Sequence, residues 1–241
     1  MPSAQDPPTA VCFDLDGVLI ATMPLHARAW QEALRPLGLR VSRRAIYEWE
    51  GESGIVTARK LLSQRGPTPS QDAAEALLRE KERRFQQLAR RVRVQPSLAA
   101  LLGRLSRRGI RLGLVTGTSA WELRRVVAPA TLAAFHAVVT GDRVRRGKPH
   151  PEPYRLALRR LRASPRRTLV IENAPYGIRS ARRAGVGLVI ALASSLPPRF
   201  LREAHRVVRS VRTLCVLVEQ LTTQRPARYN GRNTRRRTEC R

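Results

Sequence analysis

Cysteine is scarce in this chain, and no hydrophobic run is long. The three cysteines, Cys12, Cys215 and Cys240, are widely spaced and form no CxxC pair. Such spacing signals neither a disulfide framework nor a zinc site, so we expect free thiols in a reducing compartment. Apolar runs such as GVGLVIALA at 185–193 fall short of the roughly 18 residues that a transmembrane helix needs. The N-terminal stretch MPSAQDPPTA also lacks the features of a secretory signal. These absences predict a cytoplasmic protein with no membrane partner.

Acidic residues are few, and lysine is fewer still. The chain has 18 acidic and 46 basic residues, a formal net charge of +28. This excess favours a polyanionic partner such as nucleic acid. However, only three of the basic residues are lysine, and arginine is spread over every predicted helix. A compositional bias explains this better than a designed patch, so nucleic-acid binding is kept as a minor alternative. We expect 223–241 to be an Arg-rich disordered tail.

Short apolar runs rich in β-branched residues alternate with longer amphipathic segments along most of the chain. This alternation is typical of a parallel sheet with helices on both faces. The strands are predicted at 9–13, 110–116, 136–140, 168–172 and 187–192, with an edge strand at 205–208. The helices are predicted at 119–128, 151–162, 175–184 and 211–221, with a short one after Pro198. We therefore expect an α/β fold with a doubly wound, Rossmann-like parallel sheet.

One long interval does not follow this alternation. Between the first two predicted strands the sequence offers helical segments only, at 26–38, 43–50, 54–64 and 70–91. We therefore predict an all-helical cap domain over 21–93, inserted into a core domain formed by 1–20 and 94–222. The segment 92–97 is expected to be the linker that returns the chain to the core.

Polar residues with a shared chemistry follow the ends of several predicted strands. They are the pair Asp14 and Asp16, the stretch TGTS at 116–119, Lys148, and the pair Glu172 and Asn173. Ligands of open parallel sheets gather at the carboxyl ends of the strands, so these groups are expected to converge. Carboxylates suit Mg²⁺, while an ammonium and helix-terminal amides suit a phosphoryl group. Each element alone is also compatible with an ordinary turn or helix cap. Their combination predicts a phosphate-and-magnesium site.

Several motifs carry a resemblance to a known family. FDLDGVL at 13–19, VTGTS at 115–119, GKPHPEPY at 147–154 and VIENAPYGIRSARRAGV at 170–186 resemble the four signatures of the haloacid dehalogenase-like hydrolases. TMPLHARAW at 22–30 and YEWEG at 47–51 are similar to the cap entry of the β-phosphoglucomutase-like branch. The resemblance covers residues 9 to 195 and implies a Rossmann-like core with a helical cap.

The resemblance also implies roles for individual residues. Asp14 would be the nucleophile that forms an aspartyl phosphate, and Asp16 the acid and base. The phosphate would be bound by Thr116, the Gly117 amide and Lys148. Magnesium would be bound by the Asp14 carboxylate, the Asp16 backbone carbonyl, Glu172 and Asn173. Two residues depart from the family pattern, because Asn173 replaces a common acid and Ala21 replaces a common aspartate. Weaker magnesium binding is therefore expected.

The cap is expected to close over the site and to select the substrate. Its candidate specificity residues are His26, Glu50, Arg59 and Lys60. A solvated helix face is the simpler interpretation of Arg59 and Lys60. Trp30 and Trp49 are expected in the cap core.

The predicted function is that of a Mg²⁺-dependent phosphatase acting on a small phosphomonoester, a sugar phosphate or similar metabolite. One alternative is a phosphomutase of the β-phosphoglucomutase kind. A second alternative is a nucleic-acid-binding protein on a weakened hydrolase scaffold. Asp16 argues against a dehalogenase, since only an alkoxide leaving group needs a proton at that position. We expect a monomer or a weak dimer.

Overall fold

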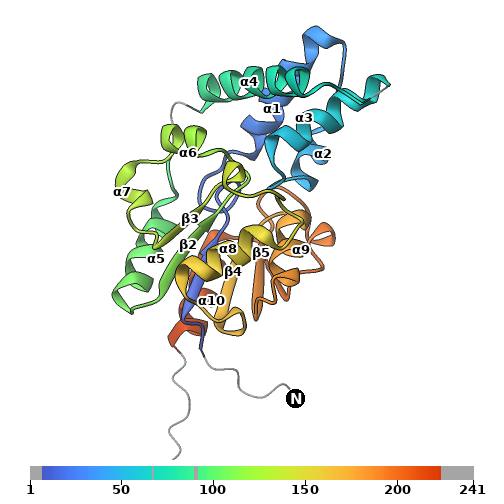
Figure 1. Cartoon of the computed structure of the whole chain (residues 1–241). Coiled ribbons are helices and arrows are strands. Elements are labelled where there is room, and N and C mark those ends of the chain that lie inside the picture. Colours follow the sequence, from blue (N-terminus) through green and yellow to red (C-terminus); the bar gives the residue numbers. More distant parts are fainter. Residues whose placement is uncertain (1–6, 67, 90–91, 224–241) are drawn as a thin grey trace, which may run out of the picture.

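A six-stranded parallel sheet forms the centre of the protein in the computed structural model, which describes residues 7–66, 68–89 and 92–223 (Figure 1). The strand order is β3-β2-β1-β4-β5-β6. The strands are β1 Ala10–Phe13, β2 Arg111–Val115, β3 Ala137–Val139, β4 Thr168–Glu172, β5 Leu188–Leu192 and β6 Arg206–Val208. All five pairings are parallel. The predicted α/β fold with a parallel sheet is confirmed.

The sheet order reverses at β1, which places the first strand in the middle. Phe13 at the end of β1 is in register with Leu114 of β2 on one side and Ile171 of β4 on the other. The loops after these three strands therefore leave the sheet side by side. The loops after β2 and β4 lie on opposite sides of the loop after β1. In open parallel sheets this switch point is where ligands bind.

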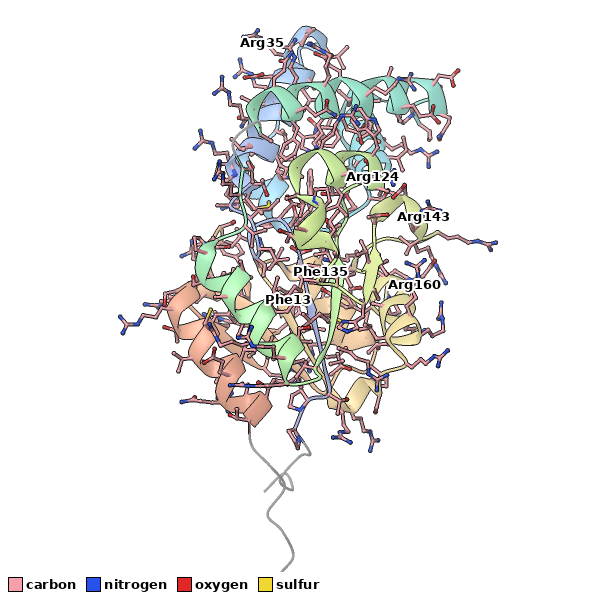
Figure 2. All side chains as sticks on the ribbon, turned by 90° about the vertical axis from the view of Figure 1, so that its left-hand side faces the viewer. Phe13, Arg35, Arg124, Phe135, Arg143 and Arg160 are labelled. Carbon is pink, nitrogen blue, oxygen red and sulfur yellow. The ribbon has the colours of Figure 1, made fainter. Side chains whose placement is uncertain are left out.

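Helices cover both faces of the sheet, as the alternation of side chains along β1 requires. Val11 and Phe13 belong to one hydrophobic cluster, and Ala10 and Cys12 belong to another on the opposite face. Phe13 meets Phe135 edge to face, with the ring centroids 6.4 Å apart (Figure 2). The covering helices are α5 Pro96–Arg107, α6 Ala120–Val126, α7 Pro129–Leu132, α8 Glu152–Leu161, α9 Pro175–Arg183 and α10 Val211–Thr223. Helices were predicted at four of these six places.

Helix α5 was missed by the sequence analysis, although its signal is present. Leu98, Leu101, Leu102 and Leu105 are all buried and follow the spacing of a helix with one apolar face. Pro96 occupies the first turn, where its missing N–H group is not needed. The last two residues of the predicted linker at 92–97 therefore belong to a helix.

Of the five described α-helices between β1 and β2, the first four pack on one another at the end of the sheet where the strands point (Figure 1). They are α1 Met23–Leu34, α2 Arg43–Glu48, α3 Gly54–Leu62 and α4 Gln71–Leu88. We call the segment 23–88 the cap. In its described part every regular element is a helix, and it has a hydrophobic cluster of its own that includes Trp30 and Leu61. The exact domain limits at 20/21 and 93/94 stay a prediction.

The arginines are distributed over the whole surface. Arg35, Arg124, Arg143 and Arg160 are exposed and project from the cap, α6, the segment after β3 and α8 (Figure 2). This distribution agrees with a compositional origin of the charge. The predicted tail at 223–241 lies outside the described residues apart from Thr223, which ends α10. Within the described ranges, no helix combines the length and the apolar character needed to cross a bilayer.

Candidate active site

An ammonium group lies between two carboxylates at the ends of β1 and β4. Lys148 Nζ donates to Asp14 Oδ1 and to Glu172 Oε1, each at 2.7 Å. It also donates to the Val115 carbonyl oxygen at the end of β2, at 3.0 Å. Asp14, Lys148 and Glu172 are at most 2% exposed. Three segments that are far apart in the sequence therefore meet at the switch point of the sheet, as the sequence predicted.

Burial and charge shift the pKa values of this group of residues. Burial lowers the pKa of Lys148, but the charges of Asp14 and Glu172 outweigh it and hold that pKa above its ordinary value. Burial raises the pKa of Asp14; Lys148 opposes this rise, and the charges of Glu172 and Asp16 add to it. The site therefore holds more carboxylate than one ammonium neutralises. A further cation here would favour the ionised form of Asp14.

Asp16 is held by donors from both the cap and the core. Thr22 Oγ1 donates to Asp16 Oδ1 at 2.5 Å, and His26 Nε2 lies 2.9 Å from the same oxygen. Thr118 Oγ1 donates to Asp16 Oδ2 at 2.8 Å. Burial raises the pKa of Asp16, but the charge of His26 and the hydrogen bonds from these partners outweigh it and hold that pKa below its ordinary value. Asp16 is therefore kept as a carboxylate.

Thr116 and Gly117 lie in the loop between β2 and α6. Thr116 Oγ1 accepts from the Thr118 N–H at 3.0 Å and lies 3.4 Å from Asp16 Oδ2. A Cβ atom on Gly117 would lie 2.8 Å from the Gly51 carbonyl oxygen, so this core loop touches the cap directly. The two predicted phosphate-binding residues are thus placed beside Asp16, and their role stays a prediction.

A loop of the cap closes against the buried lysine. Gly51 has a φ of +82°, and a Cβ atom there would lie 2.3 Å from Lys148 Cδ. The structure is therefore closed, with the loop after α2 seated on the predicted catalytic residues. Gly17 makes a similar close approach on the core side, since its φ is +84° and a Cβ atom would lie 2.1 Å from Asn173 Nδ2. Only glycine fits these two positions without displacing its neighbours.

The four predicted magnesium ligands differ in the partners they already have. Both side-chain oxygens of Asp16 accept hydrogen bonds, as described above, and its backbone carbonyl stays its predicted ligand atom. Glu172 Oε1 accepts from Lys148 and from Tyr154 Oη at 2.6 Å, and Glu172 Oε2 accepts from the Asn173 N–H at 3.1 Å. In contrast, Asp14 Oδ2 and the Asn173 side-chain amide are buried without a partner. Two free oxygen donors, one on a carboxylate and one on an amide, thus remain.

These two free oxygens fit a hard cation. Mg²⁺ is usually bound by one or two carboxylates together with water and substrate phosphate, so it does not require a full protein cage. Consistent with this, the described residues contain no group of three or more His, Cys, Asp or Glu side chains that could hold a metal ion by themselves. Asn173 supplies an amide where a second carboxylate would bind more strongly. Ala21, the other departure from the family pattern, is exposed.

A cavity of about 400 Å³ lies between the cap and the core. His26, Trp30, Trp49, Glu50 and Arg59 line it from the cap, and Gly117 and Thr118 line it from the core. Trp30 is buried in the cap cluster and Trp49 packs against that cluster, so both contribute to the cap core as well as to the cavity wall.

The candidate specificity residues of the cap differ in position. His26 is in contact with Asp16 and stacks on Phe85, with the ring centroids 3.9 Å apart. Glu50 is half-buried, whereas Arg59 is exposed and donates to Gln71. Lys60 pairs with Glu52 at 2.8 Å and lies 4.4 Å from the ring centroid of Trp49.

Several residues of the site were not predicted from the sequence. Thr118 and Tyr154 lie inside motifs that were recognised, and Thr22 begins another. The hydroxyl groups of these three residues were the feature of the sequence from which their place in the site could have been predicted. Lys81 and Glu122 form a buried ion pair beside the cavity. They are 41 positions apart in the sequence, so no local pattern could have shown this contact.

A parallel α/β sheet with a buried Asp–Lys–Glu group at its switch point and a helical cap over it is the arrangement of a hydrolase. The chain belongs to the haloacid dehalogenase-like hydrolases, whose family model matches residues 8–185.

Relatives with known names agree with this family. The chain is 33% identical over 196 residues to protein CbbY of Cereibacter sphaeroides, covering 76% of this chain and 83% of that protein. It is 31% identical over 204 residues to hexitol phosphatase A of Escherichia coli (strain K12), covering 85% and 92%. The structure of CbbY from Rhodobacter sphaeroides in complex with phosphate matches with a TM-score of 0.71 at 28% identity, covering 83% of this chain and 93% of that one. The chain is thus a hydrolase of phosphoric monoesters.

The fold is also that of a β-phosphoglucomutase from Clostridium difficile. The two chains match with a TM-score of 0.77 at 20% identity, covering 89% of this chain and 97% of that one. At this identity the likeness shows the fold alone.

Proposed function

We propose that the protein is a magnesium-dependent phosphatase that hydrolyses a small phosphomonoester, a sugar phosphate or similar metabolite, through an aspartyl phosphate on Asp14. The observation that carries the proposal is the position of Lys148. Its ammonium contacts Asp14 Oδ1 while Asp14 Oδ2 is left without a partner. One oxygen of the carboxylate is thus available to attack phosphorus beside a positive charge, and the other is available to a cation.

In the first step of the proposed reaction, Asp14 Oδ1 forms a bond to phosphorus as the bond to the ester oxygen breaks. The leaving alkoxide takes a proton from the hydrogen-bonded pair of Asp16 and His26. Lys148 neutralises the phosphoryl oxygens near Asp14. In the second step water attacks the phosphorus, Asp16 accepts its proton, and phosphate and free Asp14 are released. The low pKa of Asp16 keeps it ionised and able to accept this proton, which it then passes to His26, because a carboxylate of such low pKa is too weak a base to retain it.

Magnesium would be held by Asp14 Oδ2 and Asn173 Oδ1, the two free oxygens. When bound, it supplies positive charge that brings the anionic phosphoryl group close to the Asp14 carboxylate. Exclusion of water from the reacting atoms is supplied by the protein itself. The cap loop at Gly51 covers Lys148, and the burial of Asp14 keeps bulk water away from the reacting atoms.

The decisive test is a phosphate-release assay across sugar phosphates, polyol phosphates and an aryl phosphate, with and without Mg²⁺. The wild-type protein is expected to release phosphate in the presence of Mg²⁺, and Asp14→Asn is expected to abolish release. Absence of release from every compound would refute the proposal. A mutase would instead convert glucose 1-phosphate to glucose 6-phosphate in the presence of a bisphosphate primer, with little free phosphate.

A further inference from the structure

The cavity between the cap and the core is acidic, although the chain as a whole is strongly basic. Five of the 18 acidic residues line it, namely Glu50, Glu52, Glu82, Glu122 and Asp142. Besides His26, which is in contact with Asp16, its basic lining residues are Arg59, Lys81 and Arg145. With 46 basic residues in the chain, a random surface would show the opposite balance. The charge of this cavity is therefore a feature of the site and not of the composition.

The lysines at the cavity are already neutralised by carboxylates. Lys81 Nζ donates to both carboxylate oxygens of Glu122, at 3.1 and 3.3 Å, and both side chains are buried. Just behind the wall, Lys60 Nζ donates to both oxygens of Glu52 at 2.8 Å. A substrate anion could recruit either ammonium only by leaving a partly or fully buried carboxylate unpaired, which is strongly unfavourable.

The two arginines of the cavity lie at its rim. Arg59 and Arg145 are both exposed, and the guanidinium of Arg59 donates to Gln71. Exposed cations of this kind are screened by water and salt, so they add little to the binding of a buried group.

Three carboxylates of the cavity, Glu50, Glu82 and Asp142, form no ion pair with a residue that the structure describes. Glu50 is half-buried, and burial raises its pKa with the charges of Asp16 and Asp14 adding to the rise. Glu82 accepts a hydrogen bond from Ser119 Oγ at 3.2 Å, and burial together with the charge of Glu122 raises its pKa. For both Glu50 and Glu82 burial is the largest cause of the raised pKa; neighbouring carboxylates add to the rise, and Lys148 and Lys81 respectively oppose it.

The same cavity adjoins the groups that act on phosphate. His26 and Thr118 line it and also contact Asp16. A phosphomonoester with its phosphate at Asp14 and Lys148 would therefore extend its alcohol part into this space. Carboxylate oxygens there accept hydrogen bonds from hydroxyl groups, but a second phosphate or a carboxylate would face them without a free ammonium.

We infer that the substrate is a monophosphate whose alcohol part is uncharged and bears hydroxyl groups, with no second anion. This inference rests on the proposed phosphatase function and narrows its substrate class. It excludes bisphosphates and phosphorylated acids as good substrates, since like charges placed together in a site cost several kcal/mol of binding free energy.

Two pairs of compounds that differ at one carbon test the inference. Glycerol 3-phosphate is compared with 3-phosphoglycerate, and sorbitol 6-phosphate with 6-phosphogluconate, so that CH₂OH replaces a carboxylate in each pair. In each pair kcat/KM is expected to be at least about tenfold higher for the compound with the CH₂OH group than for the compound with the carboxylate. For compounds that turn over slowly, the same ratio is read from competitive inhibition of aryl phosphate hydrolysis. Equal or better use of the anionic members overturns the inference while the phosphatase function stands. No phosphate release from any compound refutes the proposed function itself.

Substitutions inside the cavity give a second test. Glu122→Gln frees the ammonium of Lys81, and Glu82→Gln removes a negative charge without exposing a buried lysine. Each substitution is expected to lower the ratio of kcat/KM for the CH₂OH compound to kcat/KM for the carboxylate compound by about threefold or more. The matched control is Glu75→Gln, which changes an exposed residue of the same helix α4 outside the cavity. A preference that is unchanged in both cavity variants, with thermal unfolding showing that they are folded, overturns the inference.

Discussion

Lys81 of α4 and Glu122 of α6 form a buried ion pair that joins the cap to the core, with Lys81 Nζ 3.1 Å from Glu122 Oε1. Lys81 Nζ also lies 4.8 Å from the ring centroid of Phe85, the residue that stacks on His26. The Lys81–Glu122 pair is therefore separated from His26, the partner of Asp16, only by the ring of Phe85.

Loss of one member of this pair is expected to destabilise the protein. Lys81→Ala leaves the Glu122 carboxylate buried without its partner, which costs about 3 kcal/mol of unfolding free energy. The double variant Lys81→Met with Glu122→Leu removes both charges and is expected to recover most of that loss. Urea unfolding followed by circular dichroism measures both. A single variant as stable as the wild type would show that the pair contributes nothing to the closed structure.

The ammonium of Lys148 is expected to be essential for activity. Lys148→Met leaves Asp14 and Glu172 without their shared partner, so kcat should fall by about a hundredfold or more. Lys148→Arg should not restore it, because Gly51 packs on the aliphatic stem of the lysine and leaves no room for a guanidinium. Steady-state kinetics of phosphate release tests this, with circular dichroism as the folding control. Full activity of Lys148→Arg would contradict it.

A methyl group at Gly51 is expected to disturb the site. Gly51→Ala places a Cβ atom against Lys148 Cδ, and it also strains a backbone with a φ of +82°. The control is Gly109→Ala, where φ is +73° and a Cβ atom would meet nothing within 4 Å. Both variants should lose about 1 kcal/mol of stability from the left-handed backbone. Only Gly51→Ala should lower kcat/KM, and equal losses of kcat/KM in the two variants would refute the contact.

The residue at position 173 is expected to limit magnesium affinity. Asn173→Asp replaces a neutral amide ligand of the proposed metal site by a carboxylate, so Mg²⁺ should bind about tenfold more tightly. Isothermal titration calorimetry measures this without turnover, and the Mg²⁺ dependence of phosphate release gives a second reading. Unchanged affinity would place the metal away from residue 173.

A low pH is expected to remove the stabilisation that the Glu80 carboxylate gives to helix α4 of the cap. Hydrogen bonds from Arg83 and Arg84 lower the pKa of Glu80 from its ordinary value of 4.5 to about 2. The stabilisation by this carboxylate is therefore complete above its ordinary pKa and is lost as the pH falls towards its folded pKa. Glu80→Gln should cost about 0.5 kcal/mol at neutral pH, and the difference from the wild type should shrink between about pH 5 and about pH 2. A difference that does not depend on pH would show that the effect is not electrostatic.

Much of the fold could be predicted because it depends on local patterns. Strand β1 is a continuous apolar run, AVCF, as a strand buried on both faces requires, and its side chains alternate between two hydrophobic clusters. Asp14 and Glu172 could be placed together because residues at the ends of parallel strands share one edge of the sheet. Helix α5 was missed because the segment before it resembled a linker, even though its leucines have helical spacing.

The sequence by itself determined the order of the strands, which follows from periodicity, and the family, which four motifs indicate. It also indicated which groups would meet around Lys148, since most of them follow the end of a strand. Only the tertiary structure decided which oxygens of those groups are free. It also showed that the cavity is lined by carboxylates whose neighbouring lysines are already paired. Such contacts depend on how the cap helices pack against the core, and packing brings together residues such as Lys81 and Glu122 that no local spacing relates.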